Sequence, residues 1–134
     1  MLRLAIAAIV LSALPARAQD ASGASPHALC QTHADAMLTA LGEAKYDAAA
    51  ANFDDSLRTR YTPAKLKQDY EALPAKLGKA MGRGRAHAGE MGGHPAVMTA
   101  LIFEHGLSTA EIRCDGAGAV SDFKLETTQT MGTP

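Results

Sequence analysis

The stretch AVMTALIFEHGLSTAEIRC, residues 96–114, decides the fold of this chain. Apolar and polar side chains recur along both of its arms with the period of two that is typical of a β-strand with one buried face. His105-Gly106 lies between the arms and suits a tight turn. The stretch therefore predicts two antiparallel strands, at 96–104 and 107–114.

The same period continues on both sides of this hairpin. Residues 80–90 and 119–126 predict two further strands, which are connected to the hairpin by Gly92-Gly93 and by the turn sequence DGAG at 115–118. Together the four segments predict a four-stranded antiparallel meander.

The two tight turns imply a register that can be tested for consistency. A two-residue turn at Gly92-Gly93 pairs Met91 with His94, His87 with Met98, Gly84 with Leu101 and Gly82 with Phe103. A two-residue turn at His105-Gly106 pairs Leu101 with Ala110, Thr99 with Ile112 and Val97 with Cys114. Both turns place the same side chains on one face, whereas a slip of one residue would exchange the faces.

The predicted core face is apolar, and the predicted outer face is charged. The core face collects Val97, Leu101, Phe103, Ala110, Ile112, Cys114, Phe123 and Leu125. It also carries the small residues Gly82, Gly84, Ala86 and Ala88, which would let a helix or Phe103 approach closely. The outer face collects Arg83, Arg85, His87, Glu111, Arg113, Asp122, Lys124 and Glu126.

Three helices are predicted ahead of the sheet. Ser25-Pro26 supplies an N-cap and a proline at the first helical position, and Gly42 ends that helix. The second helix carries Tyr46, Ala49, Ala50 and Phe53 on one face. The third begins at Thr62-Pro63, should kink or end at Pro74, and is closed by Gly78. The expected fold class is α+β, with three N-terminal helices packed on one face of a four-stranded antiparallel meander sheet.

Residues 1–18 have the pattern of a secretory signal peptide, with a positive start, an apolar run and Ala16-Arg17-Ala18 before the expected cleavage site. The run is too short to span a bilayer, which takes about 20 residues. We expect a flexible linker at 19–25, a single domain at 26–127 and a disordered tail at 128–134. The expected location is the periplasm or the extracellular space, with no membrane span in the mature chain.

The two cysteines, Cys30 and Cys114, are expected to pair, because an oxidising compartment favours a disulfide. Thirteen basic and fourteen acidic residues give no footprint for nucleic acid. No cofactor is expected.

Packing and turn residues carry a resemblance to a known superfamily. In the helical half they are Lys45, Tyr46, Ala49, Phe53, Asp54, Thr62, Leu66, Leu73 and Gly78, and in the sheet they are Phe103, Glu104, His105, Gly106, the turn at 115–118 and Val120. In these residues the chain resembles the nuclear-transport-factor-2-like superfamily, and within it a family of small exported domains of unknown function. The resemblance implies a cone-like fold without an established activity. Tyr70 stands where that family usually has a tryptophan.

One set of candidate site residues lies on the first predicted hairpin. His87, Met91, His94 and Met98 share a sheet face as two cross-strand pairs. Thioether and imidazole ligands suit Cu(I), so periplasmic copper binding is one hypothesis. The alternative is a structural or solvated role, because methionine also serves as an adaptable apolar filler.

A second set could line a pocket between the helices and the core face: His33, Tyr70, Thr99 and Ser121. Such a pocket would favour a ligand-binding module, or a ketosteroid-isomerase-like enzyme acting on a small molecule. The interpretation we favour is a module that binds a small-molecule ligand or a protein without catalysis. The outer face could form a homodimer through an apolar centre with a charged rim, the centre being Met98, Ala100, Ile102, Leu107 and Val120.

Overall fold

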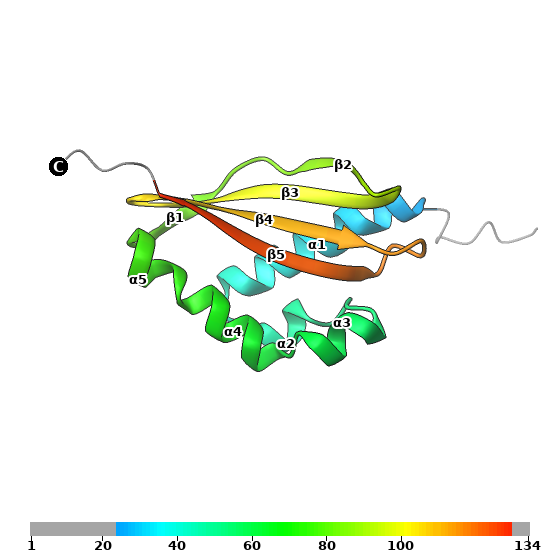
Figure 1. The fold of residues 1–134 in the computed structure, drawn as a ribbon, viewed down its shortest axis with the longest axis horizontal. Coiled ribbons are helices and arrows are strands. Elements are labelled where there is room, and N and C mark those ends of the chain that lie inside the picture. The colour runs from blue at the N-terminus through cyan, green and yellow to red at the C-terminus, as the bar shows by residue number, and fades with distance from the viewer. Residues whose placement is uncertain (1–23, 130–134) are drawn as a thin grey trace, which may run out of the picture.

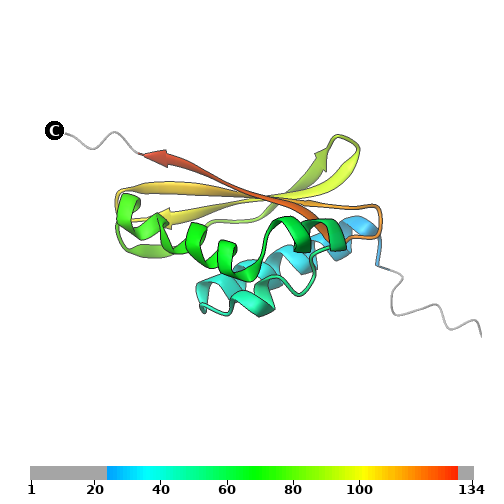
Figure 2. The ribbon, with the colours of Figure 1, turned by 60° about the horizontal axis from the view of Figure 1, so that its bottom comes forward.

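Five strands form one antiparallel sheet, and the helices lie on one side of it, in the computed structural model, which describes residues 24–129 (Figures 1 and 2). The strands are β1 (Ala80–Arg83), β2 (His87–Met91), β3 (His94–Phe103), β4 (Gly106–Cys114) and β5 (Val120–Gln129). β3 pairs with both β1 and β2, β4 pairs with β3, and β5 pairs with β4. The predicted signal peptide, most of the predicted linker and residues 130–134 lie outside the described residues.

The described residues 24–129 form five helices, where three were expected. They are α1 (Pro26–Gly42), α2 (Tyr46–Ala49), α3 (Asp55–Arg60), α4 (Pro63–Glu71) and α5 (Leu73–Leu77). The predicted starts are confirmed, because the Ser25 hydroxyl accepts from the Ala28 N–H and the Thr62 hydroxyl accepts from the Lys65 N–H. Pro74 interrupts the last predicted helix as expected, so that α4 and α5 are separate.

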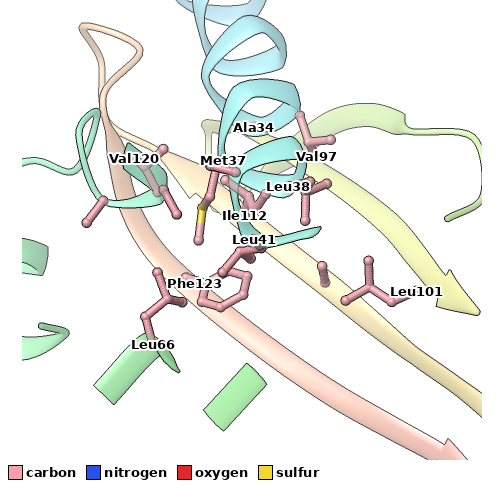
Figure 3. Packing of buried hydrophobic residues seen from close by; sticks show 14 of the residues in the cluster. Ala34, Met37, Leu38, Leu41, Leu66, Val97, Leu101, Ile112, Val120 and Phe123 are labelled. Atoms are coloured by element: carbon pink, nitrogen blue, oxygen red, sulfur yellow. The ribbon is translucent and has the colours of Figure 1, made fainter. Parts of the chain in front are cut away.

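The core lies between α1 and the sheet. Met37 and Leu41 point from α1 toward Ile112 and Phe123 of the sheet, and Leu66 of α4 packs beside the Phe123 ring (Figure 3). The predicted core face is confirmed for the seven residues Val97, Leu101, Phe103, Ala110, Ile112, Cys114 and Phe123, all of which are buried, whereas Leu125 is partly buried. Cys30 of α1 and Cys114 of β4 form the expected disulfide, with 5.8 Å between their Cα atoms.

The first predicted strand is broken into β1 and β2. His87 pairs with Met98 and Met91 with His94, as expected, but Arg83 pairs with Leu101 and Gly82 with Ile102. The predicted pairs of Gly84 with Leu101 and of Gly82 with Phe103 are therefore wrong by one residue. One extra residue lies in the segment 84–86, so Gly82 and Arg83 lie on the opposite face from the one expected, whereas β2 keeps the expected register.

The turn between β3 and β4 lies one position earlier than expected. Leu101 pairs with Ser108, Thr99 with Ala110 and Val97 with Ile112, so the turn consists of Glu104 and His105. The predicted register is therefore wrong by two residues. Because a slip of two preserves the faces, the assignment of buried residues survives.

Val120 lies in the core and not on the outer face. Arg113 pairs with Asp122 but Cys114 pairs with Val120, so β5 has an extra residue at this point. This bulge turns Val120 inward, and it removes Val120 from the apolar centre that we expected on the outer face.

Candidate functional site

A cleft of about 420 Å³ lies between α1 and the edge of the sheet formed by β1, β2 and β3. This volume is within the range of small-molecule sites, roughly 300–1,000 Å³. The lining from α1 is Gln31, Asp35 and Leu38, and the lining from the sheet side is Arg83, Gly84, Ala86, Ala88, Val97 and Thr99.

Small residues explain why this part of the interface is hollow. Gly84, Ala86 and Ala88 lie in the cleft wall, and none of them has a side chain long enough to reach α1. We expected these residues to let a helix approach closely. The space that these small residues leave forms part of the cleft.

Thr99 is the polar residue in the wall of the cleft that lacks a partner. It is only 2 % exposed, and its hydroxyl has no hydrogen-bond partner among the described residues. Leaving a hydroxyl buried and unpaired costs about 1–3 kcal/mol.

Arg83 crosses from β1 to α1 and lies at the boundary of the cleft. Its guanidinium donates to Oδ1 of Asp35 at 2.7 Å, to the Asp35 carbonyl at 3.5 Å and to the Thr39 hydroxyl at 3.1 Å. We expected Arg83 on the outer face, and the one-residue slip in the segment 84–86 is what turns it toward the helix.

A second hollow, of about 270 Å³, lies on the other side of Arg83. It shares Leu38 and Arg83 with the first cleft, and the rest of its lining is Gly42, Tyr70, Ala80, Gly82, Leu101 and Phe103. Burial raises the pKa of the Tyr70 phenol, and the nearby charge of Arg83 acts in the opposite direction. The phenol therefore stays neutral at physiological pH.

The four predicted pocket residues do not meet in one place. Thr99 lines the first cleft and Tyr70 the second hollow. His33 donates from Nδ1 to the Gly118 carbonyl at 2.7 Å, and the Ser121 carbonyl accepts from Arg60. His33 and Ser121 belong to neither lining, so these two contribute to the turn and the edge of β5.

The predicted pocket residues did not include Gln31, Asp35 and Arg83, which line the cleft. The signal for Arg83 was present, because glycines at 82 and 84 flank it, and a glycine inside a strand pattern indicates a bulge. Gly82 has φ +146°, a conformation that other residues rarely adopt. For Gln31 and Asp35 the sequence carries no comparable signal.

The methionine and histidine pairs on β2 and β3 are confirmed as cross-strand neighbours. No group of three or more His, Cys, Asp or Glu side chains within residues 24–129 is arranged to hold a metal ion. Copper binding through two histidines and two methionines stays a prediction.

No protein-family model, curated protein or solved structure matches the chain. None of the described helices has the length and apolar character needed to cross a membrane.

Proposed function

We propose that this chain is an exported domain that binds a small molecule, without catalysis, in the cleft between α1 and strands β1 to β3. The observation that carries the proposal is the Thr99 hydroxyl, which is buried in the cleft wall and unpaired. A bound molecule with one polar atom opposite Thr99 would satisfy that hydroxyl.

The surroundings of Thr99 suit a ligand that is partly apolar. Val97 and Leu38 supply aliphatic surface on the two sides of the cleft, while Gln31 and Asp35 supply polar groups on the α1 side. Ligand sites in proteins combine a largely apolar wall with a few polar groups that orient the ligand.

A pair of matched variants separates ligand binding from a structural role. Ser108 is the second buried hydroxyl without a partner, and it belongs to neither cavity lining described above. We expect Thr99→Val and Ser108→Ala each to raise the free energy of unfolding by about 1–3 kcal/mol, because each removes an unpaired buried hydroxyl. Only Thr99→Val should weaken ligand binding.

The measurement is native mass spectrometry of protein purified from the exported fraction without denaturation. The wild type and Ser108→Ala should carry the same small-molecule adduct, and Thr99→Val should lose it. An adduct that persists in Thr99→Val, or a wild type that carries none, would contradict the proposal.

Export and fold relationship form the second part of the proposal. The signal-peptide pattern of residues 1–18 and the Cys30–Cys114 disulfide support a periplasmic or secreted location. Helices on one side of an antiparallel sheet support the proposed kinship with the nuclear-transport-factor-2-like superfamily.

The alternative function is a ketosteroid-isomerase-like reaction in the same cleft, with Asp35 as the carboxylate in the lining.

We also propose that two copies of the chain form a homodimer through the outer face of the sheet. Met98 and Ile102 of β3 are 38 % and 43 % exposed there, beside the charged residues Glu111 and Arg113 of β4. An apolar centre with a polar rim is the usual anatomy of an interface.

A further inference from the structure

Arg83 separates two hollows of different chemical character. The first cleft offers the polar groups of Gln31, Asp35 and Thr99. The second offers Leu101, Phe103 and the ring of Tyr70, and is mostly apolar. Since Leu38 and Arg83 belong to both linings, a ligand that fills both would have its polar end and its apolar end on opposite sides of Arg83.

The size of the second hollow limits what it can hold. At about 270 Å³ it is smaller than most independent ligand sites. At the roughly 30 Å³ that one water molecule occupies in the liquid, it accepts about nine groups of that size. This is the room that a short alkyl chain needs.

Arg83 is better placed than Asp35 to select the charge of the polar end. The Arg83 side chain is 35 % exposed and that of Asp35 is 72 % exposed, so the guanidinium is the more desolvated of the two. Its bonds to Asp35 and Thr39 use both Nη2 hydrogens and one Nη1 hydrogen, and of these the bonds to Asp35 come from Nη1 and Nη2. Its charge also acts on the Tyr70 phenol, which lines the apolar hollow.

We propose that the ligand is a single-chain carboxylate of medium length, with its carboxylate bound by Arg83 and its alkyl chain between Leu101, Phe103 and Tyr70. This inference rests on the proposed function and adds the ligand class. A solvent-exposed ion pair contributes little to stability, so a ligand carboxylate can compete with Asp35 for the guanidinium. Once Asp35 is displaced, the Nη1 and Nη2 donors that it occupied can bind a ligand carboxylate in the bidentate geometry that suits a planar guanidinium.

The test uses defined probes on the full mature chain. Isothermal titration calorimetry compares octanoate with 1-octanol, octylammonium and acetate, which vary the charge and the chain separately. We expect octanoate to bind more tightly than the other three. Arg83→Gln should weaken octanoate binding about 10- to 100-fold, the loss expected when a charged hydrogen-bond partner is removed.

Arg85→Gln is the matched control, because Arg85 lies two residues away, is exposed and belongs to neither lining. It removes the same charge and should leave the octanoate affinity unchanged. Circular dichroism of both variants reports whether the fold is intact.

Each other outcome overturns the inference in a recognisable way. If 1-octanol binds as tightly as octanoate, the carboxylate is not recognised; if octylammonium binds best, Asp35 selects a cation instead. If no probe binds, or if Arg85→Gln weakens binding as much as Arg83→Gln, the assigned ligand class is wrong. The adduct lost in Thr99→Val decides the proposed function separately, so the two can fail independently.

Discussion

At the scale of single residues, Gly118 is a position where backbone conformation and packing both require glycine. Its φ is +85°, and a Cβ there would lie 2.7 Å from the Cβ of Leu29. Its carbonyl also accepts the hydrogen bond from His33. We expect Gly118→Ala to lower the free energy of unfolding by about 2–4 kcal/mol through backbone strain and overpacking, as measured by urea denaturation.

Gly116 in the same turn provides the control. A Cβ at Gly116 meets nothing within 4 Å, and its φ is not in the left-handed region. Gly116→Ala should change the free energy of unfolding by no more than about 0.5 kcal/mol. Equal losses in the two variants would show that the turn resists any side chain, and that the contact with Leu29 is not the cause.

Most side chains of the sheet could be assigned to a face from the sequence, and Arg83 and Val120 could not. Alternation predicted the buried set on β3 and β4 because a register error of two residues leaves every face unchanged. Arg83 and Val120 each lie next to an extra residue, in the segment 84–86 and in β5 respectively. A bulge shifts the pattern by one, and local alternation cannot detect it.

At the scale of elements, the short helix α3 depends on its N-cap. The Asp54 carboxylate accepts from the Leu57 N–H at 2.8 Å, and Leu57 is buried in the core. The Asp54 N–H donates to the Val120 carbonyl, so the cap also connects α3 to β5. We expect Asp54→Ala to cost about 0.5–2 kcal/mol, as measured by thermal and urea unfolding.

Asp54→Asn should retain nearly all of that stability, because asparagine caps helices as well as aspartate does. Asp55→Ala, at the next position, removes a fully exposed carboxylate and should be almost neutral. A full loss in Asp54→Asn would mean that the charge of Asp54, and not its hydrogen bond, stabilises α3.

The sequence signals for helix starts were stronger than those for helix continuity. Ser25-Pro26 and Thr62-Pro63 both mark true starts. The hydroxyl caps a free backbone N–H, and the fixed φ of proline suits the first helical position. The segment 46–60 was harder, because α2 and α3 contain only four and six residues and depend on tertiary contacts for their stability.

At the scale of the whole molecule, the Cys30–Cys114 disulfide connects the helical layer to the sheet. It closes a loop with a sequence separation of 84. On the chain-entropy model such a loop contributes about 4–5 kcal/mol, a large part of the stability of a domain of this size. We expect dithiothreitol to lower the free energy of unfolding of the wild type by about that amount, which a lower urea midpoint would report.

The control is the double variant Cys30→Ala/Cys114→Ala, which should be as unstable as the reduced wild type and should not respond to dithiothreitol. A wild type with an unchanged midpoint after complete reduction, verified by mass, would contradict this account of the disulfide.

The fold class and the disulfide could be predicted because each depends on a pattern in the chain, whereas the position of the cleft could not. Thr99 and Tyr70 were both named, but the hollow between α1 and the segment 84–88 results from the distance at which two layers are held apart. The glycines at 82 and 84 indicate the bulge before β2, but no local pattern records how α1 docks against it.

The disulfide also has a mechanical consequence. The start of α1 and the end of β5 lie at opposite ends of the molecule in Figure 1, and a pull applied to these two ends would pass from α1 to β4 through the Cys30–Cys114 bond. At 3.3–3.6 Å per residue, roughly 280–300 Å of chain is thereby shielded from tension. All residues that line the two hollows, from Gln31 to Phe103, lie inside that loop. While the bond is intact, a force on the ends of the chain therefore cannot extend the segment that forms the cleft.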